Sequence, residues 1–313
     1  MKHSLFSPLQ KLLDQSLTPG ALRLLLVSML AWSPAQADSN TSSSSGTREA
    51  PSRVVQSGLL QQILAAPHRQ ASSARDRYRH PAATLQFFEV EPQQTVMEIW
   101  PGASGWYSEI LAPYLKDNGR FIAAHFPTGT NTGYFERARN SFMEKARSQP
   151  ELYGAMEVVS FDPGASQPLA PANSVDRILT FRNAHNWYMN GGENGVKQAF
   201  SQFLAALKPG GILGVVDHRL APEQPLSAQK NSGYMNQDDV IRMAREAGFE
   251  LVATSEINAN PLDNREHTKG VWSLPPTLQE GDHNRDAYLA IGESDRMTLK
   301  FRKPLAGHTA SPG

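Results

Sequence analysis

The stretch Thr95–Gly105, TVMEIWPGASG, decides the fold of this chain. Residues 95–100 are mostly apolar and predict a short buried strand. Pro101 and Gly102 interrupt that strand, and a helix is expected over 106–116. A strand that passes through a glycine turn into a helix is the first unit of the nucleotide-binding α/β folds, because backbone there must approach the ligand closely. We therefore take these residues as the centre of the fold.

The same alternation of strand and helix continues to the end of the globular region. Alternating strands and crossover helices predict a doubly wound, mostly parallel sheet with helices on both faces. Such sheets bind ligands outside the carboxyl ends of their strands. The further strands are expected at 120–126, 156–161, 175–181, 212–216, 249–257 and 296–302, and the further helices at 132–148, 195–207 and 238–247.

Composition excludes several classes of chemistry. The chain has 313 residues and no cysteine, which rules out disulfides, thiolate metal sites and cysteine nucleophiles. Lysine and arginine together number 30, as do aspartate and glutamate. This balance gives no indication of nucleic-acid binding. The histidines show no metal-ligand spacing, and we predict no metal site.

The N-terminus has the features of a secretory signal peptide over residues 1–37. Basic residues precede an apolar run at 24–32, and Ala35-Gln36-Ala37 provides a small-x-small cleavage site. An uncleaved anchor is the alternative, although the run is short for a bilayer span. We expect an exported, periplasmic protein with no stable membrane insertion after cleavage.

The remaining chain divides into three parts. Residues 38–53 are rich in serine and predict a disordered linker. Residues 54–304 have the pattern of one globular domain, and 305–313 are expected to be a disordered tail.

Several segments carry a family resemblance. They are Arg79–Pro81, Glu98–Gly102 with Trp106 and Tyr107, Ala123–Phe126, Asn183–Trp187 and Tyr288–Met297. With them the chain resembles the class I S-adenosylmethionine-dependent methyltransferases, and more narrowly a family of exported bacterial predicted methyltransferases. The resemblance runs from about 78 to 304. It implies a Rossmann-like methyltransferase fold with seven strands and an antiparallel last strand, S-adenosylmethionine as cofactor and a small-molecule substrate.

The resemblance also implies a set of cofactor-binding residues around the strand ends. Phe161 and Asp162 would contact the adenine. Trp100 and Ser104 replace two glycines of the usual loop, and His125 lies near the place of the acidic residue that holds the ribose. The full set is Glu98, Trp100, Gly102, Gly105, Trp106, His125, Phe161, Asp162, Arg182 and Asn183.

Polar and aromatic residues follow the fourth predicted strand, where class I enzymes place catalytic groups. His185 is the candidate general base because its ordinary pKa suits proton transfer near neutral pH. Asn186 and Asp217 are the other catalytic candidates, as groups that orient the base or the substrate. Candidate substrate contacts are Arg79, His80, Trp187 and His218. The insertion 258–295 is expected to form a lid over the substrate.

Three functions are compatible with this pattern to different degrees. The leading one is a methyltransferase acting on a small molecule in the cell envelope. A non-catalytic periplasmic ligand-binding protein that keeps the fold is the alternative. A nicotinamide dehydrogenase is disfavoured because the loop lacks the three-glycine spacing. The oligomeric state does not follow from the sequence.

Overall fold

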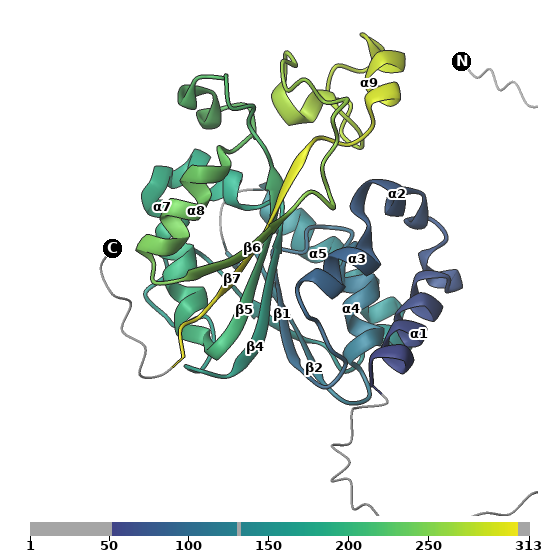
Figure 1. The fold of residues 1–313 in the computed structure, drawn as a ribbon. Coiled ribbons are helices and arrows are strands. Elements are labelled where there is room, and N and C mark those ends of the chain that lie inside the picture. The colour runs from purple at the N-terminus through teal and green to yellow at the C-terminus, as the bar shows by residue number, and fades with distance from the viewer. Residues whose placement is uncertain (1–51, 130–132, 306–313) are drawn as a thin grey trace, which may run out of the picture. The chain divides into compact units, whose positions relative to one another are not determined.

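A seven-stranded mixed sheet forms the centre of the molecule (Figure 1), which is described here as a computed structural model. The strand order is β3-β2-β1-β4-β5-β7-β6, with β7 antiparallel to both of its neighbours and the other pairs parallel. This confirms the predicted fold class, including the antiparallel last strand. The strands are β1 (Thr95–Ile99), β2 (Arg120–His125), β3 (Glu157–Ser160), β4 (Val175–Phe181), β5 (Leu207–His218), β6 (Glu250–Ser255) and β7 (Arg296–Arg302).

The structure describes residues 52–129 and 133–305. The predicted signal peptide 1–37 lies outside these residues, as do 38–51 of the predicted linker and 306–313 of the predicted tail. None of the helices in the described ranges is both long and apolar enough to cross a bilayer.

Helices cover both faces of the sheet because the buried strands carry apolar residues on both sides. On β1, Met97 and Ile99 join one apolar cluster and Val96 joins the other. Figure 1 shows α7 and α8 on one face and α1, α3 and α4 on the other. The helices are α1 (Ser52–Leu64), α2 (Asp76–Arg79), α3 (Pro81–Phe87), α4 (Ser108–Leu115), α5 (Gly133–Ser148), α6 (Pro150–Tyr153), α7 (Ala184–Ala206), α8 (Gln237–Glu246) and α9 (Arg285–Ile291).

Two elements differ from the sequence prediction by more than two residues. Helix α7 consists of two helical parts that meet at Gly192, where the backbone is not helical; the second part matches the helix predicted at 195–207, and the first part, from Ala184, was not predicted. Strand β5 begins at Leu207 rather than at 212, because Leu207 already pairs with Val175 and the Gly210 amide donates to the Lys303 carbonyl. The glycines of 208–211 therefore start a strand instead of separating it from the helix.

The order of the strands places a switch point between β1 and β4. The chain runs outward from β1 to β3, then crosses back to β4 on the other side of β1. Crossovers that leave in opposite directions open a crevice at the carboxyl ends of such a pair. The segment between β6 and β7, with α9, lies above these ends in Figure 1.

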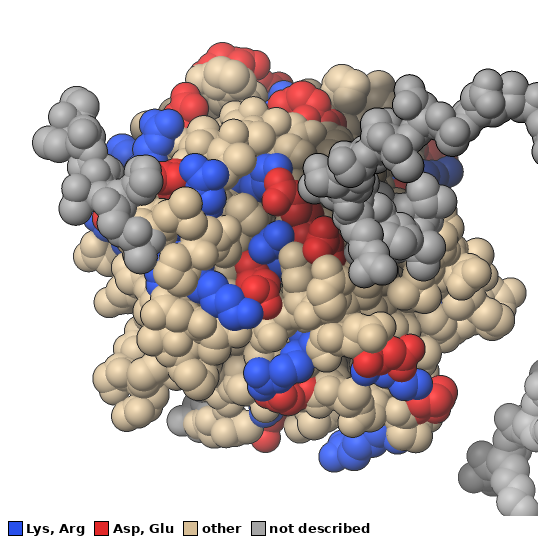
Figure 2. Space-filling model, turned by 60° about the horizontal axis from the view of Figure 1, so that its bottom comes forward, with Lys and Arg blue, Asp and Glu red and all other residues tan. Residues whose placement is uncertain are grey.

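The face at which the parallel strands begin carries both signs of charge. Figure 2 shows lysine and arginine interspersed with aspartate and glutamate over this face. No extended basic surface is present on the side shown, in keeping with the balanced composition.

Candidate functional site

A cavity of about 540 Å³ lies at the carboxyl ends of β1, β4 and β5. Its size is that of a small-molecule site. The β1 loop and the start of α7 form one side, and the segment 258–295 covers another. The lining residues that the argument uses are Arg79, Glu98, Trp100, Gly102, Trp106, Tyr107, Arg182, Asn183, His185, Asn186, His218, Trp272, Glu293, Ser294 and Arg296.

The loop after β1 turns through two glycines with left-handed backbone. Gly102 has φ +72° and Gly105 has φ +57°, and a Cβ on Gly105 would lie 2.5 Å from the Phe142 ring. Only glycine meets both demands at position 105 without strain. The loop then enters α4, where the Ser108 hydroxyl donates to Glu98 at 2.6 Å. Both predicted glycines thus shape the turn, as their spacing suggested.

Glu98 is a buried carboxyl at the end of β1. Burial raises the pKa of Glu98 to about 7, although the Ser108 hydrogen bond and the nearby Arg182 and Arg79 oppose the shift. Close to neutral pH this side chain therefore holds a proton about half of the time, so it is able to give or take one within the cavity.

The raised pKa makes the stability of the protein depend on pH. The protonated carboxyl favours the folded state fully below about pH 4.3, and this stabilisation is lost as pH rises through 7. Glu98→Gln removes the titrating group and keeps an acceptor for Ser108. We expect the variant to gain about 1–3 kcal/mol relative to the wild type between pH 4 and 8. Urea unfolding across this range measures the difference, and a constant difference would contradict the assignment.

Arginines surround a single buried carboxylate, Glu293, at the rim of β7. Arg79 donates to it at 3.0 Å, Arg75 donates at 2.6 Å, and Arg296 also bonds to it. Burial opposes ionisation, but Arg296, Arg79, Arg75 and Arg182 together hold the pKa of Glu293 well below its usual range. The negative charge of Glu293 therefore interacts with the positive charges of four arginines.

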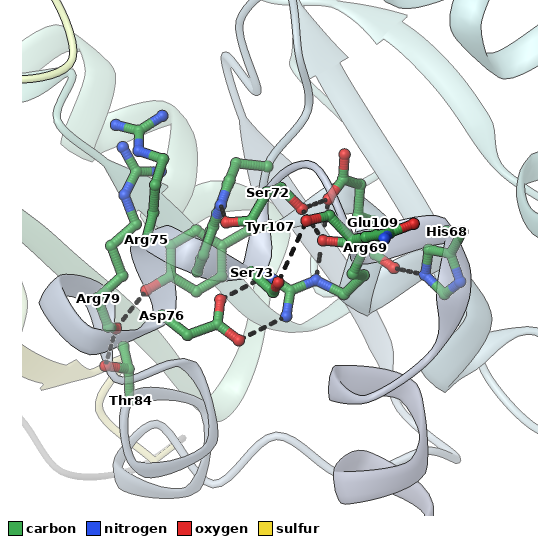
Figure 3. Close-up of polar contacts among 12 residues, drawn as sticks. His68, Arg69, Ser72, Ser73, Arg75, Asp76, Arg79, Thr84, Tyr107 and Glu109 are labelled. Carbon is green, nitrogen blue, oxygen red and sulfur yellow. Dashed lines mark hydrogen bonds and ion pairs between the residues drawn. The ribbon is translucent and has the colours of Figure 1, made fainter. Parts of the chain in front are cut away.

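A polar network fixes the segment that carries Arg75 and Arg79 (Figure 3). Buried Arg69 forms two hydrogen bonds with Asp76, of 2.9 and 2.8 Å, and the Tyr107 hydroxyl donates to the Arg79 carbonyl at 3.1 Å. Figure 3 shows the Arg75 and Arg79 side chains extending in one direction, away from the Arg69 pair. The segment before β1 thus places the guanidinium groups of Arg75 and Arg79 next to Glu293, which lines the cavity.

Among the arginines that line the cavity, Arg182 is the one whose side chain has no hydrogen-bond or ion-pair partner within the described residues. Its backbone has φ +64°, and its amide donates to the Val216 carbonyl at 2.7 Å, so the chain is held in a sharp turn at the end of β4. Its guanidinium makes no hydrogen bond or ion pair with another described residue. Burial lowers the pKa of Arg182 to about 10, which leaves it protonated at neutral pH. An unpaired, partly buried cation in a positive cavity favours an anionic ligand.

A histidine–carboxylate pair lies beside this arginine. Asp217 at the end of β5 accepts from His185 Nδ1 at 2.8 Å and from the His185 amide at 3.1 Å. Asp217 is fully buried and His185 is 4% exposed. A carboxyl oxygen that accepts from Nδ1 fixes the proton of His185 on that atom, which leaves Nε2 with a free lone pair. His185 therefore has the tautomer of a general base.

His218 lies next to this pair. Its ring centre is 5.0 Å from that of His185, and its Nδ1 contacts the Ser294 hydroxyl. Burial, His185 and the arginines of the cavity hold the pKa of His218 well below its usual range. His218 is therefore neutral at physiological pH.

His185, Asp217 and His218 each bring a possible metal-ligand atom to within 4.8 Å of one another. Two observations speak against a cation there. The Asp217 oxygens already accept three hydrogen bonds, the third from the His218 amide at 2.8 Å. The nearby arginines also make the surroundings positive. The cluster is therefore better described as a hydrogen-bonded histidine–carboxylate pair with a neighbouring histidine than as a cation site.

Trp100 fills the space between the ends of β2 and β3. Its indole Nε1 donates to the Phe161 carbonyl at 3.0 Å, and its ring centre lies 4.8 Å from Phe126 and 5.9 Å from Phe161. The side chain is 8% exposed. Removing a buried tryptophan from such a position costs about 3–5 kcal/mol.

The residues present do not fit an adenosyl group. The region that the resemblance assigns to adenine, at Phe161, is occupied by the indole of Trp100. The position expected to hold the ribose carries His125, which is fully buried and contacts the Gly102 carbonyl at 3.2 Å. Burial lowers the pKa of His125 to about 4, and its Nδ1 accepts from the Phe126 amide at 2.8 Å. His125 therefore contacts the loop after β1 from its buried side and supports its conformation.

A second hollow of about 320 Å³ lies on the other side of Trp100. Asp162 and Trp187 line it, and Trp100 and Asn186 line both hollows. Trp187 is 2% exposed and packs in the apolar cluster between sheet and helices. Trp100 therefore lies between two hollows, together with Phe135 and Asn186.

The structure brings most of the predicted site residues to the main cavity. Those that line it are Arg79, Glu98, Trp100, Gly102, Trp106, Arg182, Asn183, His185, Asn186 and His218. Asp217 lies directly behind His185, and Gly105 and His125 support the loop. Phe161, Asp162 and Trp187 lie beyond Trp100, and His80 lies in a different hollow.

Sequence reasoning missed the residues that give the cavity its charge. Glu293, Ser294 and Arg296 lie in the segment Tyr288–Met297, which carried the resemblance but received no role. The dense run Glu293-Ser294-Asp295-Arg296 immediately before an alternating strand was the available indication. Arg75 was missed because only the fold brings it to Glu293.

Solved structures with the same fold are known, although no family model and no curated protein matches the sequence. The crystal structure of the [4+2]-cyclase SpnF has a TM-score of 0.50 at 16% identity, over 82% of this chain and 95% of that one. A putative sarcosine dimethylglycine methyltransferase from Galdieria sulphuraria has a TM-score of 0.49 at 14% identity, over 75% and 86%.

A SAM-dependent methyltransferase from Aquifex aeolicus has a TM-score of 0.46 at 17% identity, over 64% of this chain and 93% of that one. Likenesses at such identities establish an architecture and leave the reaction open, because one fold serves many reactions. By its strand order and its likeness to the cyclase SpnF, the chain has a Rossmann-like methyltransferase fold.

Proposed function

We propose that this protein is an enzyme that binds a small anionic molecule in the 540 Å³ cavity and removes a proton from it with His185. The observation that carries the proposal is the neighbourhood of two groups. A histidine held in the tautomer of a base by Asp217 lines the same cavity as Arg182, a cation that has no side-chain partner in the part of the chain that the structure describes.

The geometry supports a different role for each of these residues. The guanidinium of Arg182 would bind the anionic group through charge-assisted hydrogen bonds, which are stronger than neutral ones. Asp217 orients His185 and stabilises the imidazolium that forms when His185 takes a proton. Glu98, with its pKa raised to about 7 by burial, is a second group that could return a proton.

Methyl transfer from S-adenosylmethionine to a small molecule is the second candidate. The fold favours it, whereas the indole of Trp100 against Phe161 speaks against it. The N-terminal sequence favours the cell envelope as the location for either reaction.

A non-catalytic binding protein of the cell envelope is the third possibility. Such a protein would use the arginines to bind its ligand but would not use the imidazole–carboxylate pair. A measurement of turnover therefore distinguishes it from the two enzymes. A protein without catalysis would have no use for an orientated, buried base at its ligand.

The proposal is tested by incubating the full chain with a mixture of small carboxylic and phosphorylated metabolites, with and without S-adenosylmethionine. Mass spectrometry then follows each compound. We expect one anionic compound to be consumed by the wild type in both conditions and to persist with Arg182→Met. Consumption only with S-adenosylmethionine would favour the second candidate. Binding without consumption would overturn the enzyme proposal.

A further inference from the structure

We propose that the indole of Trp100 takes the place of an adenine base, so that the chain does not use S-adenosylmethionine. Position 100 carries a glycine in the loop of the class that the sequence resembles. Trp100 keeps the backbone that such a glycine would have, with φ +48°. The loop therefore has the backbone conformation expected for a glycine at position 100, although this position carries the tryptophan side chain.

The added side chain occupies the ligand region itself. Parallel sheets of this kind bind ligands beyond their carboxyl ends, and the indole lies at those of β2 and β3, against Phe126 and Phe161. Phe135 and Trp187 contact it from two further sides, with ring centres 5.6 and 5.8 Å away. An indole is a flat bicyclic ring similar in size to a purine.

The hydrogen bond of the indole also resembles that of a bound base. Trp100 Nε1 donates to the Phe161 carbonyl at 3.0 Å, at the strand end where the resemblance places adenine recognition. Because this carbonyl accepts from within the chain, it needs no ligand to be satisfied. The indole ring thus takes both the space of an adenine base and the hydrogen-bond acceptor that such a base would use.

A second, independent change points the same way. No carboxylate ends β2, and His125 there is fully buried with both ring nitrogens engaged, one by Gly102 and one by the Phe126 amide. A ribose would find no acceptor for its hydroxyls at this position. The adenine site and the ribose contact are therefore both missing.

Displacement of the indole would weaken an adenosyl ligand strongly. The loss on removing a buried tryptophan corresponds to a factor of about a hundred to a few thousand in affinity. A ligand of ordinary micromolar affinity would then bind only near or above millimolar concentration. This inference concerns the ends of β2 and β3 and holds whether or not His185 is a base.

Titration calorimetry with S-adenosylhomocysteine tests the inference on the full chain. We expect no saturable binding to the wild type up to about 1 mM. Trp100→Gly empties the seat, suits the left-handed backbone and should bind at least tenfold more tightly than the wild type. Trp100→Phe is the matched control, which keeps an aromatic ring in place and should bind no better than the wild type.

Saturable micromolar binding to the wild type would overturn the inference. A folded Trp100→Gly variant without any gain in affinity would overturn it as well. Should this variant unfold, added indole offers a second measurement, because cavities left by large side chains bind ligands of the lost shape. Indole and adenosine should both raise its thermal midpoint and leave that of the wild type unchanged, whereas a rise with indole alone would contradict an adenine seat.

Discussion

Glu293→Gln is expected to lower the free energy of unfolding by about 3–5 kcal/mol, the range for breaking a buried ion pair. Glu293 is the carboxylate that Arg75, Arg79 and Arg296 share, and its side chain is 3% exposed. The variant would leave buried positive charges facing one another without compensation. Urea unfolding at pH 7 measures the effect. A loss below about 1 kcal/mol would mean that the arginines do not depend on Glu293.

The matched control is Glu157→Gln. Glu157 bonds to Arg120 at 2.7 Å as Glu293 bonds to its arginines, but this pair is about half exposed. We expect a loss of about 0–1 kcal/mol for this surface pair. Small anions add a readout that a purely structural role would not produce. Malonate should stabilise Glu293→Gln more than the wild type, because it supplies the missing negative charge.

His185→Gln is expected to lower kcat by about 10²–10⁴ with the substrate that the metabolite mixture identifies. Gln keeps a polar side chain of similar length but cannot accept a proton. Asp217→Asn should have a loss of the same order, because an amide in place of the carboxylate disturbs the tautomer of His185. Initial rates at saturating substrate measure both effects, and KM should change little since Arg182 still binds the anion.

His267→Gln is the control for these two variants. His267 also bonds to a buried aspartate, with 2.8 Å between its Nε2 and Asp263 Oδ1, but it does not line the cavity. Its replacement should leave kcat within a few-fold of the wild type. Equal losses in His185→Gln and His267→Gln would show that kcat reports damage to the fold rather than loss of a base.

The architecture was predictable from local patterns because each strand and the helices α4, α5, α7 and α8 carry their own periodicity, whereas α1, α2, α3, α6 and α9 were not predicted. Strands β4 and β7 have the predicted bounds, since short apolar or alternating runs with clear ends define them. The first part of α7 was not predicted, because the helix was expected only from residue 195, beyond Gly192, where the backbone leaves the helical conformation. Helix boundaries depend on such tertiary support more than strand cores do.

The site was predictable where one strand end supplies several residues. Arg182, Asn183 and His185 follow β4 directly, so the topology alone places them at the ligand edge. The direction of an individual side chain was not predictable. Trp100 appeared as a cofactor contact in the sequence, and only the packing against Phe126 shows that it fills the seat.

Long-range charge pairing was the other part that the sequence could not supply. The bond between Arg75 and Glu293 joins residues 218 positions apart. Neither residue has a local pattern that identifies its partner, because ion pairs of this kind depend on how the segment before β1 packs against the end of β7.

Calorimetric titration of the full chain with malonate tests most directly whether Arg182 binds an anion. We expect one anion to bind per chain, Arg182→Met to weaken this binding at least tenfold, and Arg302→Met to leave it unchanged, since Arg302 forms an exposed pair with Glu250. Equal binding by the wild type and Arg182→Met would contradict the claim that Arg182 and His185 face one bound anion.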